Sequence, residues 1–363
     1  MNEVIINGRF LTQEITGVQR YAHELMRHLD QLLIDGQIDS DQYSIILAVP
    51  PNTRDIPKYQ RIKVKCIGYL QNNLWEQISL PLFARKKILF SPCNIAPIFG
   101  GDRQLLTIHD ASVFGYPKTY TPMFLLKYRF ILKTMGEIAR IIFTDSDFSK
   151  KELMKYCSIP TEKIVVVPLG HEHILEIAAD ERILKKYNLS QRPYLFTVGS
   201  QSAHKNYKGV MLATNSIEKK DFDLIVAGGT FSKVFKNMDA SPDPTYVNLG
   251  YVNDQELRAL YEHAACFIYA SFYEGFGLPP LEAMACGCPV IASDIPALRE
   301  VCGDVAVYCD PNNPDDIKKI IQAVLSNADL MNKMKCAGIK QAQKFNWEYT
   351  TIQIWDKITS MID

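Results

Sequence analysis

The sequence lacks an excess of charge of either sign, and it lacks a long uncharged apolar run. Its 363 residues include 40 Lys plus Arg and 40 Asp plus Glu, so the formal net charge is +0 at pH 7. Without a net field the chain is not expected to bind nucleic acid, and any basic contact surface must be local. The apolar stretch 123–143 is interrupted by Lys127, Arg129, Lys133, Glu137 and Arg140. We therefore expect no membrane-spanning helix.

Paired cysteines and a targeting segment are absent as well. The nine cysteines are scattered and never show a C-x-x-C spacing, which favours reduced thiols over disulfides or a zinc site. Residues 1–10 contain no basic stretch followed by an apolar run, and residues 4–6 are instead typical of a strand. These absences predict a cytoplasmic protein without a secretion signal.

What is present is a regular alternation of short apolar strands and amphipathic helices. A chain of 363 residues is too long for one ordinary hydrophobic core, so two domains are expected. The pattern restarts after residues 165–168. It predicts an N-terminal domain (1–170), a second domain (171–345) and a terminal helix (346–363) that packs back on the first. Such alternation indicates an α/β fold of two Rossmann-like, doubly wound domains that face each other across a cleft.

The same pattern predicts individual elements. Strands are expected at 4–6, 43–49, 88–90, 104–108, 140–144, 194–198, 222–227, 246–249, 266–270 and 289–292, and helices at 18–32, 174–187, from 206 onward, 254–263 and 347–362. In open sheets of this kind, ligands bind at the carboxyl ends of the strands. Site residues are therefore expected directly after strands.

The segment 271–287 has the most specific chemistry. It follows a predicted buried strand and opens a short helix, with Gly275 and Gly277 in the turn. Glycines let the backbone approach a ligand, and free N–H groups at a helix start favour a diphosphate. Glu274 and Glu282 bracket the loop. Because a diphosphate repels carboxylates, each suits the vicinal hydroxyls of a ribose or a sugar. Taken singly, Glu282 could merely complement a helix dipole and Glu274 could be a solvated loop residue.

A second candidate anion-binding turn spans residues 197–206. Gly199 ends a predicted strand, and His204 and Lys205 lead into a helix. Lys205 could neutralise a phosphate with His204 alongside it, although a lysine at a helix start is usually only solvated. The matching position of this turn in the same half of the chain supports the phosphate-binding interpretation.

Together these segments resemble the family-4 glycosyltransferases, a large retaining family with the GT-B fold. The matching residues are 249–252, 257, 260–261, 271–294 and 296–300, which cover most of the second half. The resemblance implies that Glu282 binds the ribose of a nucleotide-diphosphate sugar and that Glu274 contacts the transferred sugar. It further implies that the backbone of Phe276 to Leu278 lines the sugar diphosphate and that Lys205 binds phosphate. His204 stands where many members carry arginine, which leaves Lys205 largely alone.

The first half resembles the family less tightly. Gly17, on the donor side, and Arg20, on the acceptor side, belong to a segment similar to the family's glycine-containing turn into its first helix. His109 and Asp110 are similar to its acceptor-side H-D pair, in which a neutral imidazole can orient a hydroxyl. The alternative for His109 is a buried, hydrogen-bonded histidine at a strand end. Residues 7–10, 75–77 and 91–94 look like members that build bacterial surface polysaccharides, often with mannose.

Asp145-Ser146-Asp147 is a D-x-D sequence, which in the unrelated GT-A glycosyltransferases binds a divalent metal. Here it follows a predicted strand, and Ser146 is typical of a helix N-cap, so we favour a cap. No other acidic or histidine cluster has ligand spacing, and we predict no metal. Tyr251 and Val252 are expected near the nucleotide base. His171 and His173, in the expected hinge, receive no role.

The predicted activity is metal-independent, retaining transfer of a hexose, with mannose from GDP-mannose preferred, to a saccharide or lipid-linked saccharide. No cofactor is required besides the nucleotide-sugar co-substrate. A nucleotide-sugar epimerase and an inert sugar-nucleotide binder are alternatives that the fold alone cannot separate. The basic residues 85–87 and the helix with Lys127, Arg129 and Lys133 leave two interpretations open. They form either a face that rests on the inner side of a membrane or two solvated helix faces.

Overall fold

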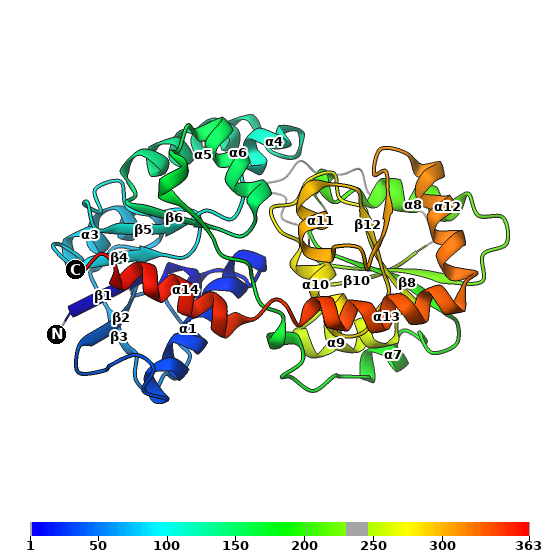
Figure 1. The fold of residues 1–363 in the computed structure, drawn as a ribbon, viewed down its shortest axis with the longest axis horizontal. Coiled ribbons are helices and arrows are strands. Elements are labelled where there is room, and N and C mark those ends of the chain that lie inside the picture. The colour runs from blue at the N-terminus through cyan, green and yellow to red at the C-terminus, as the bar shows by residue number, and fades with distance from the viewer. Residues whose placement is uncertain (1, 201, 230–245, 363) are drawn as a thin grey trace. The chain divides into compact units, whose positions relative to one another are not determined.

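The computed structural model describes residues 2–200, 202–229 and 246–362 (Figure 1). The chain divides into two compact units. The first unit comprises Met1–Ala111, Lys127–Gly170 and Trp347–Asp363, and the second comprises Ser112–Leu126 and His171–Asn346. The short segment 112–126, which the sequence pattern assigns to the first domain, thus groups with the second unit.

The first unit is built on a sheet of seven parallel strands in the order β3-β2-β1-β4-β5-β6-β7. These are β1 (Asn2–Asn7), β2 (Tyr43–Val49), β3 (Lys63–Cys66), β4 (Ile88–Ser91), β5 (Gln104–Thr107), β6 (Ile141–Thr144) and β7 (Ile164–Val166). The strands β4 and β5 are buried along their whole length, as expected where helices cover both faces of a parallel sheet.

Helices flank this sheet on both sides. They are α1 (Gly17–Ile34), α2 (Asn72–Leu74), α3 (Leu80–Phe83), α5 (Pro122–Ile138), α6 (Asp147–Cys157) and α14 (Trp347–Thr359), with a π-helical turn at Trp75–Ser79 and 3-10 turns at Gly8–Thr12 and Thr161–Lys163. Figure 1 shows α5 and α6 on one side of the sheet and α1 and α14 on the other. The terminal helix α14 packs against α1, and the rings of Tyr21 and Trp347 lie 6.2 Å apart.

The second unit contains six parallel strands in the order β10-β9-β8-β11-β12-β13. These are β8 (Tyr194–Val198), β9 (Asp223–Ala227), β10 (Val247–Gly250), β11 (Cys266–Tyr269), β12 (Val290–Ser293) and β13 (Val307–Cys309). Its helices are α4 (Ser112–Gly115), α7 (Arg182–Lys186), α8 (Tyr207–Asn215), α9 (Asp254–His263), α10 (Leu278–Ala285), α11 (Pro296–Cys302), α12 (Pro314–Leu325) and α13 (Ala328–Ala342). Short 3-10 turns lie at Pro117–Thr119, Glu172–Ile174 and Ala203–Lys205. Buried aliphatic side chains of α8 and α12 form one core layer with the sheet.

The two-sheet α/β architecture confirms the predicted Rossmann-like fold, but one predicted helix is wrong. Residues 174–187 form a 3-10 turn at Glu172–Ile174 and the short helix α7 instead of one long helix. The carbonyls of Leu175 and Ile177 accept hydrogen bonds from the Arg258 side chain of α9. The Asp180 side chain accepts the amide of Arg182 at the start of α7. Tertiary partners therefore replace the local helical ladder.

Two further expectations concern the cysteines and membrane-spanning helices. All nine cysteines are free, in agreement with the predicted reduced thiols. Within the described ranges, no helix combines the length and the apolar character needed to cross a bilayer.

Candidate functional site

The strand order of the second unit places the two predicted anion-binding segments side by side. The sheet winds in one direction from β8 to β9 and in the other from β8 to β11, so the neighbouring strands β8 and β11 form the switch point at which ligands bind in open sheets. The turn 199–205 follows β8 and the loop 271–277 follows β11. The Phe272 amide donates to the His204 carbonyl at 2.7 Å, which ties the two segments together.

Two glycines shape these segments because a side chain would not fit. Gly277, the N-cap of α10, has φ +119°, and a Cβ there would lie 2.6 Å from the Leu298 side chain. Gly199 has φ +146°, a backbone conformation that residues with a side chain rarely adopt. A Cβ on the neighbouring Gly228 would lie 1.8 Å from the Gly199 carbonyl oxygen. Pro279 and Pro280 in the first turn of α10 have no N–H, and the amides of Gly199 and Lys205 in the turn after β8 donate to backbone carbonyls. A ligand that approaches this backbone closely would therefore meet chiefly the N–H groups of residues 276–278.

Lys205 and Glu274 form an ion pair at the centre of this switch point. The Lys205 Nζ lies 2.8 Å from Glu274 Oε1 and 3.0 Å from Oε2, and it donates to the Tyr269 hydroxyl at 2.6 Å. Only 15% of the Lys205 side chain and 10% of the Glu274 side chain are exposed. Burial on its own would raise the pKa of Glu274, but the Lys205 ammonium outweighs it and holds the pKa below its usual range. The carboxylate is therefore ionised, and the pair carries no net charge.

His204, next to the ion pair, is neutral at physiological pH. Burial, with a further contribution from the charge of Lys205, lowers the pKa of His204 to about 4. Its ring nitrogens lie 3.3 Å from the Thr119 hydroxyl and 3.4 Å from the Ser202 hydroxyl. Lys205 is thus the charged member of the predicted His-Lys pair. Gln201 of this turn lies outside the described residues.

Glu282, the second predicted carboxylate, is held from two sides. His173 Nε2 lies 2.9 Å from Glu282 Oε1, and the Tyr261 hydroxyl donates to Oε2 at 3.0 Å. The residue is only 7% exposed and lies on α10. Each oxygen keeps a second lone pair, so the carboxylate can still accept hydrogen bonds from a diol while its orientation is fixed.

The remaining predicted donor residues of the second unit lie at the start of α10 and after β10. Phe276 and Leu278 are buried, and the Phe276 ring packs edge-on against Phe345 at 5.7 Å, so only the backbone of this stretch can face a ligand. Tyr251 follows β10 and is 72% exposed, and Val252 next to it is half-buried. An exposed aromatic ring after a strand end is compatible with the predicted base contact.

In the first unit, His109 follows β5 and is buried between two hydrogen-bond acceptors. Its Nδ1 lies 2.8 Å from Asp145 Oδ2, and its Nε2 lies 3.2 Å from the Pro92 carbonyl oxygen. The Pro92 carbonyl can only accept, so Nε2 carries a proton, while the proton between Nδ1 and the Asp145 carboxyl is shared by that pair. Burial opposes the charged ring, but the Asp145 carboxylate prevails and raises the pKa of His109. Burial raises the pKa of Asp145 too, so this coupled pair titrates as a unit.

This geometry modifies two expectations. A neutral His109 that orients a ligand hydroxyl would first have to give up one of its two partners. The D-x-D interpretation is confirmed for Ser146, which caps α6 by accepting the Ser149 amide at 3.0 Å. However, Asp145 is more than a flanking residue, because it holds His109. Among the described residues, no three His, Cys, Asp or Glu side chains are grouped closely enough to bind a metal.

The other predicted first-unit residues lie at or near the start of α1 and after β5. Gly17 is the first residue of α1, where a Cβ would meet open space. Arg20 lies 3.7 Å from Glu24 in an ion pair along the same helix. Asp110 adjoins His109 and favours its charged form. His109 and Asp110 are consecutive residues after β5, whereas Arg20 forms its ion pair within α1.

Sequence reasoning missed four functional partners. Tyr269 contacts Lys205, and Tyr261 and His173 both contact Glu282. In the first unit, Asp145 contacts His109. Tyr269 and Tyr261 lie within elements whose positions were predicted, so a polar tip on a buried aromatic was an available signal. His173 offered none, because its partner is 109 positions away.

Comparison with known proteins gives a consistent result. The sequence profile of the family described as "Glycosyl transferases group 1" matches residues 179–341. An O-antigen chain mannosyltransferase B of Escherichia coli is 34% identical over 265 residues, 69% of each chain. The O-antigen chain mannosyltransferase RfbU of Salmonella typhimurium is 26% identical over 341 residues, covering 90% of this chain and 91% of its own.

A solved structure shows the same fold. Sucrose-phosphate synthase from Thermosynechococcus elongatus superimposes with a TM-score of 0.75 at 17% identity, covering 100% of this chain and 99% of the other. At this identity the likeness concerns the fold alone, which is the GT-B arrangement of two Rossmann-like domains.

Proposed function

The chain belongs to the group 1 glycosyltransferases, and we propose that it transfers mannose from GDP-mannose to a saccharide or lipid-linked saccharide during synthesis of a surface polysaccharide. The 34% identity to an O-antigen chain mannosyltransferase supports the sugar and the type of product. The buried Lys205–Glu274 pair at the switch point of the second sheet is the observation that carries the transfer chemistry.

In this proposal the donor diphosphate binds at the start of α10 and against Lys205. The three hydrogen bonds of the Lys205 ammonium go to Tyr269 and to both oxygens of Glu274. A phosphate must therefore take over at least one of them, which releases a carboxylate oxygen. The released oxygen accepts a hydroxyl of the sugar, so one exchange serves both the phosphate and the sugar.

The ribose is assigned to Glu282, which would accept both of its hydroxyls. His173 and Tyr261 fix the carboxylate before the nucleotide arrives. A preorientated acceptor loses less freedom on binding than a mobile side chain does. Tyr251 and Val252 are assigned to the base, and Gly17 to the donor side.

The acceptor is assigned to the first unit, around His109, Asp110 and Arg20. We propose that His109 serves here chiefly by holding the Pro92 carbonyl and Asp145 in place. The leaving phosphate oxygen then takes the proton of the acceptor hydroxyl. No metal takes part in this scheme, since Lys205 and the backbone N–H groups of Phe276 to Leu278 stabilise the diphosphate.

We further propose a peripheral contact with the inner face of a membrane through α5. Met123, Leu126 and Phe130 are 77%, 73% and 65% exposed on this helix, and Lys127 and Lys133 are exposed beside them. Apolar side chains between lysines on one helix face suit the boundary of an anionic bilayer. In contrast, Lys87 of the basic stretch 85–87 is engaged by Glu3 at 2.8 Å.

The membrane proposal is tested by sedimentation with vesicles containing phosphatidylglycerol. We expect Phe130→Ser to reduce binding and Leu212→Ser, which changes a 52% exposed leucine on α8, to leave it unchanged. Equal binding of both variants would refute the α5 contact without affecting the transfer proposal.

The transfer proposal is tested by incubating the protein with GDP-mannose, GDP-fucose, UDP-glucose and UDP-galactose, with and without mannosyl acceptors. We expect acceptor-dependent release of GDP from GDP-mannose alone and a new glycoside. A new nucleotide sugar would indicate an epimerase. Nucleotide binding without any product would indicate an inert binder.

A further inference from the structure

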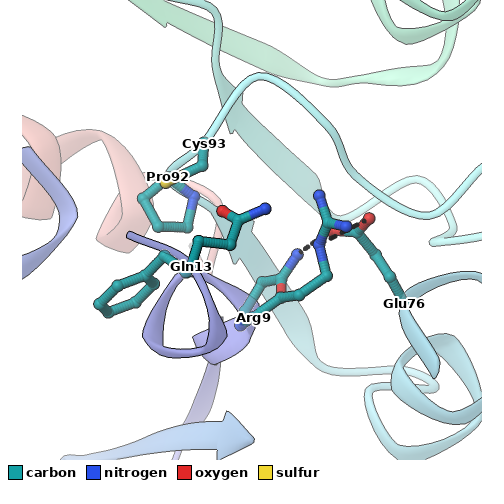
Figure 2. A pocket seen from close by; sticks show the side chains of 7 residues that line it. Arg9, Gln13, Glu76, Pro92 and Cys93 are labelled. Carbon is teal, nitrogen blue, oxygen red and sulfur yellow. Dashed lines mark hydrogen bonds and ion pairs between the residues drawn. The ribbon is translucent and has the colours of Figure 1, made fainter. Parts of the chain in front are cut away.

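Each sheet has a buried polar side chain at its switch point, but the two side chains differ in their hydrogen-bond partners. In the first unit, where β1 meets β4, the buried Glu76 is bound from two sides (Figure 2). Its Oε1 accepts from the Asn7 amide at 2.7 Å, and its Oε2 lies 3.2 Å from Arg9 Nε. The hollow beside them has a volume of about 10 Å³, which is room for about one water. The polar groups at this point therefore satisfy one another.

In the second unit, the corresponding buried polar group is the hydroxyl of Tyr207, the first residue of α8. The Tyr207 ring belongs to the apolar core that includes Val210 and Ala213, and the residue is 6% exposed. Its hydroxyl lies beside the turn after β8. A Cβ on Gly199 would lie 3.2 Å from the Tyr207 oxygen and 3.6 Å from Lys205 Cε. The tip of Tyr207 and the stem of Lys205 therefore lie on the same side of Gly199.

The Tyr207 hydroxyl makes no hydrogen bond to any residue that the structure describes, although its oxygen is buried. Two other buried tyrosines of this unit have partners, since Tyr194 donates to the Leu260 carbonyl at 2.8 Å and Tyr261 donates to Glu282 at 3.0 Å. A buried hydroxyl without a partner costs free energy, which a phenylalanine ring in the same core would avoid. Burial also raises the pKa of Tyr207, so the group stays protonated and can both donate and accept.

The neighbour best placed to bind this hydroxyl is the ammonium of Lys205. The ammonium lies one bond beyond the Cε atom that is close to the Tyr207 oxygen, on a flexible stem. It now lies 2.8 Å from Glu274 Oε1, and donor binding as proposed draws it from that carboxylate towards a phosphate. Each acceptor that it leaves must then be replaced, because an ammonium carries three donors. His204 cannot share the charge, since burial lowers its pKa to about 4.

We propose that Tyr207 is a positioning residue for Lys205, and that its hydroxyl oxygen accepts the ammonium when the diphosphate draws it away from Glu274. Tyr269 has the equivalent part on the Glu274 side, where its hydroxyl accepts from Lys205 at 2.6 Å. The lysine thus has a tyrosine acceptor in each of its two positions. Tyr207 acts through the lysine and does not touch the sugar. This inference rests on the proposed transferase function and adds a residue to the phosphate side of the same site.

Three substitutions test this role. Tyr207→Phe removes the hydroxyl alone, and Lys205→Met keeps the stem without the ammonium. Tyr194→Phe is the matched control, because it removes a buried hydroxyl that has a partner and lies at the opposite end of β8. We expect Tyr194→Phe to lower the melting temperature and Tyr207→Phe to leave it unchanged or raise it, since only the first breaks a hydrogen bond within the protein.

Binding of inorganic pyrophosphate, followed by phosphorus NMR, is the first readout, because pyrophosphate is a diphosphate without a base or a sugar. We expect its Kd to rise about 10-fold in Tyr207→Phe, as for the loss of a hydrogen bond to a charged group, and to stay unchanged in Tyr194→Phe. Adding Tyr207→Phe to Lys205→Met should cause no further loss. Calorimetry with GDP should show the same pattern, whereas guanosine, which has no phosphate, should bind to all variants equally.

The outcomes separate this inference from the transferase proposal. Pyrophosphate binding that depends on Tyr207 and Lys205, in a protein that does not use GDP-mannose, supports the positioning role and refutes the donor assignment. Transfer from GDP-mannose with equal rates and equal pyrophosphate affinity in wild type and Tyr207→Phe refutes the positioning role alone, and an ordered water is then the partner of the hydroxyl. An equal loss with and without the Lys205 ammonium shows that Tyr207 does not act through the lysine. Failure of the wild type to bind pyrophosphate also overturns the inference.

Discussion

Breaking the Lys205–Glu274 pair should change stability and activity in different ways. The two side chains lie 2.8 Å apart and are 15% and 10% exposed. Removing one partner from such a buried pair leaves the other charge uncompensated, which costs about 3 kcal/mol or somewhat more. We expect Lys205→Ala to lower the free energy of unfolding by this amount. For a unit of this size the melting temperature then falls by roughly 6–12 °C.

The double variant Lys205→Met with Glu274→Gln removes both charges together. Replacing a buried ion pair by neutral groups is often close to neutral for stability. We therefore expect the double variant to unfold within about 1 kcal/mol of the wild type. With about 3 kcal/mol lost in each of Lys205→Met and Glu274→Gln alone, this corresponds to a coupling energy of about 5 kcal/mol between the two sites. Calorimetric unfolding of the wild type, both single variants and the double variant measures this coupling.

Activity should not recover with stability. Lys205 stabilises the charge that develops on the departing diphosphate, and losing such a group costs roughly 3 kcal/mol of barrier, or about a hundredfold in rate. Both Lys205→Ala and the double variant should show this loss in nucleotide release. A stable double variant with nearly wild-type turnover, or a loss below about fivefold in Lys205→Ala, would assign the charge stabilisation to the start of α10 instead.

Four further predictions concern nucleotide binding, turnover, acid stability and metal dependence. Glu282→Ala should weaken nucleoside diphosphate binding about 10- to 100-fold in calorimetry, because a charged acceptor of the ribose is lost, whereas Glu274→Gln should reduce turnover more than affinity. His204 has a folded-state pKa of about 4, below its value of about 6.5 in the unfolded chain, so acid favours unfolding as the pH falls between these values. Between pH 7 and pH 5 the free energy of unfolding should fall by about 2 kcal/mol through this group. The unfolding free energy of His204→Gln should therefore depend less on pH in that range. Transfer should survive exhaustive EDTA treatment, and loss that manganese or magnesium restores would refute the metal-free scheme.

The alternation of strands and helices was enough to predict the fold, because each element has a strong local pattern. Strands Tyr43–Val49 and Tyr194–Val198 and helix Asp254–His263 have the predicted bounds. The error at 174–187 arose where local pattern and tertiary contact disagree. There Arg258, from a helix some 80 positions further on, binds the carbonyls of Leu175 and Ile177.

The contacts between the site residues were less predictable from the sequence than the identity of the residues. Lys205 and Glu274 were each identified from turns after strands, but their mutual pairing depends on the neighbouring positions of β8 and β11, which local sequence does not specify. The same holds for His173 with Glu282 and for His109 with Asp145. The helix-cap pattern at 145–147 places Asp145 at a helix start, but it does not show that the adjacent strands β5 and β6 bring Asp145 to His109.

The pairing of Glu274 with Lys205 also bears on the stereochemistry of transfer, which we predict to proceed with retention. Retention needs either a covalent sugar-enzyme adduct or attack from the face that the diphosphate leaves. Glu274 is the carboxylate assigned to the sugar, and it is fixed beside the phosphate-binding lysine. If it binds hydroxyls remote from the anomeric carbon, it cannot also be the nucleophile. Attack from the same face is then favoured.

In that route the leaving phosphate oxygen takes the proton of the acceptor hydroxyl, while Lys205 and the start of α10 stabilise the remaining charge. No protein base is required, which agrees with His109 having both ring nitrogens engaged by acceptors. NMR of the first product formed from α-linked GDP-mannose should therefore show an α linkage, and mass spectrometry of protein quenched during turnover should show no sugar on Glu274. A β-linked product would contradict retention. An adduct on Glu274 would keep retention but replace same-face attack with double displacement.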